Sequence, residues 1–183
     1  DCIVRPGFVA AHRRLAERAW FVSGNRVLLS PALTARVLRD ELAPEQWSLA
    51  RWLAERVRGG VNRIAALLHL PLGPLRRMRK TAWQGARSCN LAIWRSDLDR
   101  VDGFDADYSG WGKEDSDIIV RLLHAGVRRK DGNFATGVVH LWHQEADRGQ
   151  LDANEAKLAG VLDGDGVRAR RGLSALKAVI PAG

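Results

Sequence analysis

The sequence predicts a single α/β domain, and three observations lead to this class. Stretches with apolar residues at helical spacing alternate along the chain with short strand-like stretches. The length of 183 residues and a hydrophobic content of 46% suffice for one domain with a proper core. Internal repeats and low-complexity linkers are absent from the sequence, so we expect one domain over 1–183.

The first part of the chain is predicted to be helical around one strand-like stretch. Ser30-Pro31 resembles an N-cap followed by a proline in the first helical turn. Apolar residues surround Gly24-Asn25, which predicts either a strand pair or one strand with a bend. The expected elements are helices over 6–19, 31–43, 44–58 and 61–70 and strand structure over 20–30.

The second part alternates between strands and helices. Cys89, Leu91 and Ile93 alternate with smaller or polar residues, as in a strand. Ser96 and Asp99 have the spacing of a capping box for a short helical turn. The expected elements are strands over 89–95 and 135–143, helices over 116–125 and 153–162, and a short helix over 173–179 within a tail over 163–183.

The positive charge is concentrated in one segment. The chain has 29 Lys and Arg against 21 Asp and Glu, but residues 51–95 hold ten of the basic residues and one acid. One interpretation of the 39–80 segment is a solvated helix face. The other is a variable, basic, amphipathic insertion that rests on anionic lipid, with Trp47, Trp52 and Leu72 as anchors. Nucleic acid is not expected as a partner, because zinc ligands and base-reading signatures are missing.

The two cysteines and the hydropathy profile limit the remaining classes. Cys2 and Cys89 have no C-x-x-C spacing, so we expect reduced, half-buried side chains instead of a zinc ribbon or disulfide scaffold. Apolar runs stay below the roughly 18 residues of a membrane span, and the sequence contains no signal peptide pattern. A soluble or peripheral protein is therefore expected.

One acidic stretch has more charge than a helix start requires. Gly110-Trp111-Gly112-Lys113 precedes Glu114, Asp115 and Asp117, and an apolar run follows at once. A single acid here would match the helix dipole, but three acids in four residues repel one another. We therefore expect a functional site in the loop.

A second polar pair lies at the end of a predicted strand. His140 and His143 are three residues apart, so their side chains point to opposite faces of a regular strand. Both imidazoles reach one metal ion only if the chain bends between them. Taken alone, this spacing is more typical of structural histidines.

Together these stretches resemble the C-terminal half of family 2 glycosyltransferases. They are similar to the galactosyltransferase C-terminal module and to bacterial polysaccharide and lipopolysaccharide transferases. The resemblance covers roughly 1–160 and is most specific over a catalytic module at 88–143. The residues that carry it are Cys89 to Leu98, Val101 to Asp105, Gly110 to Asp117, Arg121-Leu122, Gly126, His140 and His143.

The resemblance implies a GT-A fold, in which a Rossmann-like nucleotide-sugar half comes first and an acceptor half second. Asp1 then matches the final acid of the Asp-x-Asp metal motif. The nucleotide-binding half is missing from the chain, and the start at Asp1 instead of Met agrees with an extension upstream. We accordingly expect a partial domain that is inactive on its own.

The resemblance also implies roles for the acidic loop. Asp115 matches the family's catalytic base, and a helix N-terminus favours its ionised form. Glu114 would hold hydroxyl groups of the acceptor or the donor sugar, with Asp117 either its partner or a structural acid. Trp111 would stack on a sugar ring, while Gly110 and Gly112 let the loop close over the donor.

The implied cofactor is a divalent metal. Asp1 and His143, together with His140, would hold it, and the diphosphate of the donor would fill other positions. A mixed carboxylate and imidazole shell suits Mn²⁺ better than Mg²⁺. Arg26 is a candidate contact for the diphosphate.

The expected function is therefore inverting transfer of a sugar from a nucleotide-diphosphate donor to a glycan or lipid-linked acceptor. The expected setting is bacterial surface polysaccharide or lipopolysaccharide synthesis, in the cytoplasm or on the inner face of the cytoplasmic membrane. Two alternatives from other classes are open at this point. One is a non-catalytic basic module for lipid or nucleic acid, and the other is a metal-dependent hydrolase that uses His140, His143 and the acids.

Overall fold

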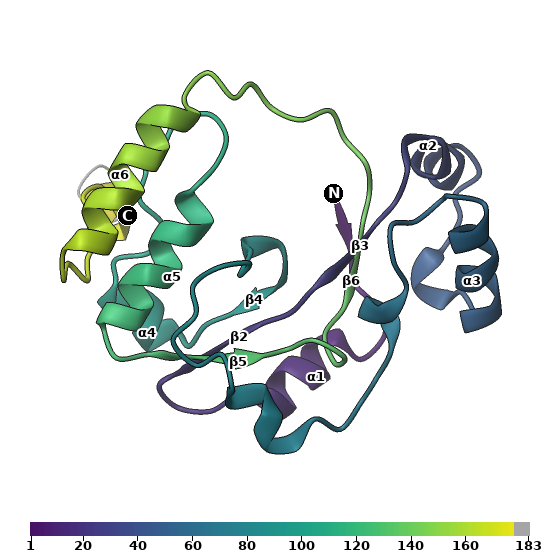
Figure 1. Cartoon of the computed structure of the whole chain (residues 1–183), viewed down its shortest axis with the longest axis horizontal. Helices are drawn as coiled ribbons and strands as arrows, with labels where there is room; N and C mark the ends of the chain where they lie inside the picture. The colour runs from purple at the N-terminus through teal and green to yellow at the C-terminus, as the bar shows by residue number, and fades with distance from the viewer. Residues whose placement is uncertain (178–183) are drawn as a thin grey trace.

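Two three-stranded sheets share two bent chain segments in this computed structural model, which describes residues 1–177. The first segment forms β2 (Trp20–Ser23) and then β3 (Arg26–Leu28), and the second forms β5 (Arg128–Asp131) and then β6 (Val138–His140). β2 pairs with β5 and β3 pairs with β6, both in parallel. The two segments therefore cross the middle of the molecule side by side (Figure 1).

An antiparallel outer strand completes each sheet. β1 (Cys2–Ile3) pairs with β6 and places Cys2 opposite His140, while Leu141 donates its backbone N–H to the carbonyl of Asp1. β4 (Leu91–Ala92) pairs with β2 beside the bend. The β1 pairing brings Asp1 to the end of β6.

A buried polar network fixes the bend between β2 and β3. Gly24 donates its backbone N–H to the carbonyl of Asn90, whose side-chain amide donates to the carbonyls of Asn25 and Thr136. A Cβ atom on Gly24 would lie 2.2 Å from Oγ1 of Thr136, so only glycine fits here. Nε2 of His12 lies 3.0 Å from the side-chain oxygen of Asn90 and completes the network.

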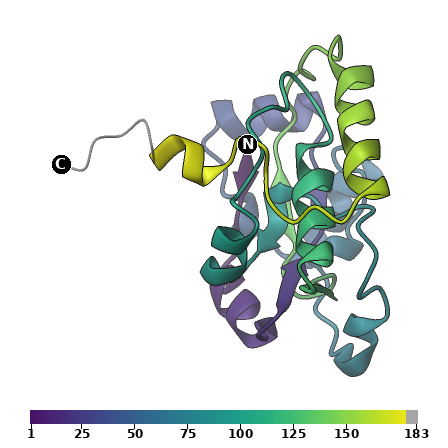
Figure 2. The same cartoon turned by 90° about the vertical axis from the view of Figure 1, so that its left-hand side faces the viewer.

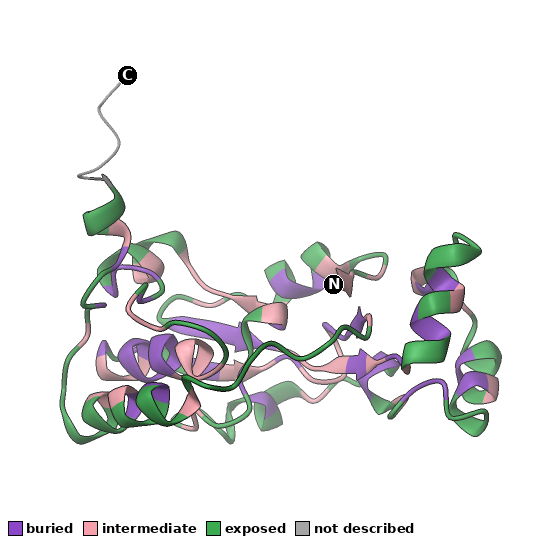
Figure 3. Ribbon diagram, turned by 90° about the horizontal axis from the view of Figure 1, so that it is seen from above, coloured by how far each residue is buried: buried purple, intermediate pink, exposed green. Residues whose placement is uncertain are grey.

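Helices cover the sheets in two groups, each with its own apolar core. Phe21, Val101 and Ile118 lie in the first core, and Trp52 and Val139 in the second. Figure 3 shows buried residues gathered along the strands and the inner faces of helices. The first group contains α4 (Arg95–Arg100), α5 (Glu114–His124) and α6 (Leu151–Asp163). The second group contains α2 (Pro31–Arg39) and α3 (Leu49–Val57). α1 (Phe8–Leu15) lies beside the sheets, and α7 (Leu173–Lys177) ends the described chain (Figure 2).

The α/β class is confirmed, and so are several local predictions. Oγ of Ser30 accepts a hydrogen bond from the backbone N–H of Leu33, as expected of an N-cap before Pro31. The 20–30 stretch is a bent strand whose two parts join different sheets, not a hairpin. The helices expected over 31–43 and 153–162 exist with slightly different ends, and the part of the tail beyond Lys177 lies outside the described residues.

Three other predictions were wrong, and one strand was not predicted. The 61–70 segment has one 3-10 turn, Ala65–Leu67, instead of a helix. α4 begins at Arg95 without a side-chain cap, so Ser96 does not form a capping box. The strand expected over 89–95 is limited to β4, and the charged stretch at 128–131 forms a strand that we did not expect.

One of the three expected membrane anchors, Trp52, is ruled out by its burial. Trp52 is 1% exposed and lies in a core, with the ring of Trp47 at 5.0 Å between centroids. Leu72 is half-buried. Over residues 1–177, no helix is long and apolar enough to cross a membrane.

Candidate active site

The acidic loop, residues 110–117, has backbone angles at two positions that favour glycine. Gly110 and Gly112 have φ values of +67° and +102°, in the left-handed region that glycine tolerates best. Lys113 also has a positive φ, +78°, and its ammonium group lies 2.9 Å from the carboxylate of Glu155 on α6. α5 then begins at Glu114, two residues before the expected start at Ser116.

Asp115 lies in the first turn of α5 with a free acceptor atom. Its side chain is half-buried, and Oδ1 is shielded from solvent without a hydrogen-bond partner in the described chain. Buried carboxylate oxygens are normally paired, because an unsatisfied one costs about 1–3 kcal/mol. The unpaired oxygen shows that this carboxylate is not fully used in structural hydrogen bonds.

Asp1, His140 and His143 converge at the end of β6. Oδ2 of Asp1 lies 3.3 Å from Nε2 of His140 and 3.1 Å from Nε2 of His143. The chain leaves strand conformation after His140, which brings the two imidazole centroids to 5.3 Å. The chain therefore bends between His140 and His143, as binding of one metal ion by both imidazoles requires.

This cluster suits a divalent metal in its donor atoms. A carboxylate and two imidazoles are common ligands of Mn²⁺ and similar ions. Asp1 makes no ion pair with lysine or arginine within 1–177, so its charge is not already neutralised. The thiol of Cys2 adds a further donor, since ligand atoms of Asp1, Cys2 and His140 all lie within 4.8 Å of one another.

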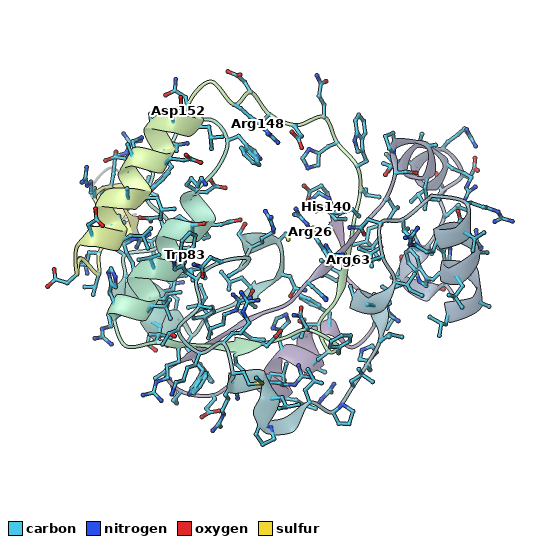
Figure 4. All side chains as sticks on the ribbon, viewed as in Figure 1. Arg26, Arg63, Trp83, His140, Arg148 and Asp152 are labelled. Atoms are coloured by element: carbon cyan, nitrogen blue, oxygen red, sulfur yellow. The ribbon has the colours of Figure 1, made fainter. Side chains whose placement is uncertain are left out.

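Arg26 lies next to this cluster and influences its charge (Figure 4). Burial, and then the nearby Arg26 guanidinium, lower the pKa of His140 and favour the neutral imidazole that binds metals. Nη1 of Arg26 lies 3.5 Å from Sγ of Cys89. A hydrogen bond from the Cys2 thiol and the charge of Arg26 lower the pKa of Cys89 to about 6, although burial opposes this. Both cysteines are free and half-buried, as expected.

One cavity of about 250 Å³ joins the acidic loop to the histidines. Its lining includes Asp115 and Trp111 from α5 and the loop before it, and also Arg26 of β3, His140 of β6 and His143 after β6. Residues predicted from separate stretches of sequence thus share one space. The complete lining is Arg26, Leu28, Leu29, Arg87, Trp111, Asp115, His140, Leu141, Trp142, His143 and Glu145.

A second cavity, of about 370 Å³, adjoins the first. Trp111, Asp115 and Arg87 line both cavities, whereas Glu114 and Gly112 line only the second. The guanidinium carbon of Arg148 lies 4.6 Å from the centroid of the Trp111 ring, so one face of this indole already has a cation on it.

Asp117 was expected to be either a partner of Glu114 or a structural acid, and its surroundings are those of a structural acid. It is 1% exposed, lines neither of these cavities, and accepts hydrogen bonds from Nε and Nη2 of Arg121 at 2.8 and 2.5 Å. Arg121 also donates to the carbonyl of Val101. The pair ties α5 to the end of α4 and does not point at the site.

Arg87 is the main site residue that the sequence reading missed. It lines both cavities and pairs with no carboxylate in the described part of the chain. The sequence analysis considered the basic residues of the 39–80 segment and assigned no role to Arg87. A signal for Arg87 was its place two residues before Cys89, at the start of the family-like stretch.

Comparison with known proteins supports a glycosyltransferase. Residues 76–144 match the family described as the N-terminal domain of galactosyltransferase. Human chondroitin sulfate N-acetylgalactosaminyltransferase 1 is 34% identical over 68 residues, which cover 36% of this chain and 12% of that protein. Human chondroitin sulfate synthase 3 is 35% identical over 66 residues, or 36% of this chain and 7% of that protein.

The matches cover only part of each protein. The chain spans about an eighth or less of the length of these curated relatives. No solved structure matches the chain. The matched family segment nevertheless contains Arg87, Trp111, Asp115, His140 and His143, so most of the shared cavity lies inside the region of similarity.

Proposed function

We propose that this chain carries the acceptor-activating part of an inverting glycosyltransferase with a GT-A fold. The observation that carries the proposal is the shared cavity of about 250 Å³, which Asp115 lines together with His140 and His143. A base and a metal-binding cluster in one cavity are what sugar transfer from a nucleotide diphosphate requires. The family and relatives matched above support the same reaction class.

The proposed step forms one bond and breaks another. The acceptor hydroxyl oxygen attacks the anomeric carbon, and the carboxylate of Asp115 takes the hydroxyl proton. The bond between the anomeric carbon and the diphosphate oxygen breaks, and its electron pair stays on that oxygen. Attack from the face opposite the leaving group inverts the anomeric configuration. Asp115 is assigned this role because its side chain lines both cavities.

The part of the cavity with the histidines would bind the diphosphate. Asp1, His143 and His140 would hold a divalent metal, Mn²⁺ in preference to Mg²⁺. When bound, such an ion neutralises the charge that develops on the leaving diphosphate. Arg26 and Arg87 place two guanidinium groups on the same cavity, where they would donate hydrogen bonds to phosphate oxygens.

The second cavity is the proposed acceptor site. Glu114 would accept hydrogen bonds from acceptor hydroxyl groups there, and Trp111 would contact a sugar at the boundary between the cavities. Galactose and N-acetylgalactosamine occur in the names of the matched family and a relative, so we propose a donor sugar with the galacto configuration. A glycan is the proposed acceptor. A role in bacterial surface polysaccharide synthesis rests on the resemblance of the sequence alone.

The test is sugar transfer by the natural gene product that contains this chain. Galactose and N-acetylgalactosamine donors should support transfer in the presence of Mn²⁺, and glucose donors should be poorer. Asp115→Asn should lower kcat by about 10²–10⁴-fold, the usual contribution of a general base, with little change in donor binding. Asp152→Asn is a matched control, because Asp152 is exposed in the first turn of α6. Normal turnover by Asp115→Asn would refute the assignment of the base.

A further inference from the structure

A short protruding segment combines exposed apolar side chains with positive charge. We call residues 70–80 the basic tip; it contains the 3-10 helix Gly73–Arg77 and lies at the lower edge of the molecule in Figure 1. Leu75 is 60% exposed and Met78 is 76% exposed, although both are large apolar side chains. Arg77, Arg79 and Lys80 are exposed between and beyond them.

A basic cavity of about 670 Å³ extends behind the tip. Arg14 of α1, Arg77 and Lys130 line it. Glu17 is the one acid that pairs with these side chains in the described residues, at 2.7 Å from Arg77 and 2.6 Å from Lys130. The sequence holds no Asp or Glu from residue 56 to residue 96, so the surface keeps a clear positive excess.

The tip is held rigidly in its protruding position. The buried guanidinium of Arg76 donates to the carbonyls of Asp131, Asn133 and Leu70 at 2.7–2.9 Å. Leu70 also donates its backbone N–H to the carbonyl of Phe134 at 3.0 Å. These bonds fasten both ends of the 3-10 helix to the turn after β5. Leu75 and Met78 therefore stay outside, where a partner can bind them without first ordering the loop.

We propose that the basic tip docks on an anionic lipid surface. Leu75 and Met78 enter the boundary between headgroups and acyl chains, while Arg77, Arg79 and Lys80 contact anionic headgroups. Charge complementarity selects this partner, because cations surround the two apolar side chains and only Glu17 opposes them. This surface replaces the anchors expected at Trp52, which is buried in a core, and at Trp47, which is half-buried against that core.

A second apolar surface provides an internal comparison. Leu49, Leu53 and Val57 are spaced by four residues along α3 and are 46–87% exposed. The nearby Arg36 and Arg58 lie next to the carboxylate of Glu55. Arg51 and Arg56 of the same helix are exposed and make no ion pair in residues 1–177, so this stripe also carries cations and must be tested separately from the tip.

The docked orientation leaves the candidate active site accessible. In Figures 1 and 4 the tip lies below β2 and β5, whereas His140 and Arg26 lie above them. A membrane at the tip would therefore not cover the cavity that contains Asp115.

Vesicle flotation of the 183-residue chain tests the proposal without any transfer assay, so its failure is separate from failure of the proposed function. The chain should float with phosphatidylcholine vesicles that contain phosphatidylglycerol and should not float with phosphatidylcholine alone. Leu75→Ser with Met78→Ser should lower the partition at least tenfold, since each side chain loses its burial in lipid. Arg79→Gln and Lys80→Gln should each lower it about fivefold.

The control is Leu53→Ser with Val57→Ser on α3, which should float like the unchanged chain. Circular dichroism should show the same fold in every variant, because all the altered side chains are exposed. Flotation that depends on the α3 residues instead of the tip would overturn the proposal. Flotation that is lost in salt but insensitive to Leu75 and Met78 would also overturn it, because it would indicate charge attraction without insertion.

Discussion

The carboxylate of Asp1 lies 3.1 Å from Nε2 of His143, although the two residues are far apart in the sequence. β1 holds Asp1 beside β6, and the chain bends after His140 to bring His143 to the same oxygen. The two imidazoles share one carboxylate that has no stronger cationic partner in residues 1–177. This relationship makes metal binding the first property to measure.

We predict that His143→Ala weakens Mn²⁺ binding at least tenfold, about 1.4 kcal/mol, because one of the nitrogen donors is lost. Electron paramagnetic resonance of free Mn²⁺ during titration measures the affinity directly and needs no substrate. His69→Ala is the control, since His69 is exposed on the basic tip's side of the molecule. Equal affinities for the two variants would remove His143 from the metal site.

Glu114 and Asp115 should differ in the kinetic parameter that they affect. Glu114 lines only the second cavity, so Glu114→Gln should raise the KM for the acceptor and leave kcat within a few-fold. Asp115→Asn should act mainly on kcat, because Asp115 is the proposed base and lines both cavities. Initial rates over a range of acceptor concentrations separate these effects. A large fall in kcat for Glu114→Gln at saturating acceptor would give Glu114 the role of the base instead.

The Asp117–Arg121 pair should act on stability and not on catalysis. Both side chains are at most 2% exposed, and removing one partner of a buried pair typically costs about 3–5 kcal/mol. Arg121→Met should lower the free energy of unfolding by this amount, measured by urea denaturation.

Arg95–Asp99 provides the matched control for that measurement. It has the same four-residue spacing in a helix, but its side chains are 74% and 44% exposed. Arg95→Met should therefore cost less than about 1 kcal/mol. Similar losses for the two variants would contradict a structural role based on burial.

Local signals predicted the elements that form from local chemistry. The N-cap at Ser30 and the bend at Gly24 depend on neighbouring residues and could be seen in the sequence. β5 could not, because its residues are mostly charged and its strand form depends on parallel pairing with β2. Tertiary pairing of this kind leaves no periodic pattern.

In the candidate site, too, local features could be predicted from the sequence and tertiary arrangements could not. The loop around Asp115 was recognisable from its charge density, and the histidines were recognisable as a pair. Their common cavity with Arg87 depends on how α5 and β6 are placed, which spacing alone does not give. The sequence left two roles open for Asp117, a partner of Glu114 or a structural acid. Asp117 lies two residues after Asp115, on roughly the opposite face of the helix, and is buried there.

The buried contact between His12 and Asn90 predicts how stability depends on pH. Burial lowers the pKa of His12, and its hydrogen bond to Asn90 opposes this only in part. The folded state therefore binds fewer protons than the unfolded state below the unfolded pKa of about 6.5. The free energy of unfolding should rise with pH up to that value and fall as the solution is acidified through it.

Urea denaturation between about pH 5 and 7 measures this slope, and His12→Gln should flatten it, because glutamine can still donate to Asn90 but does not titrate. The difference between the two slopes isolates His12 from the other histidines, and parallel slopes would show that His12 does not contribute.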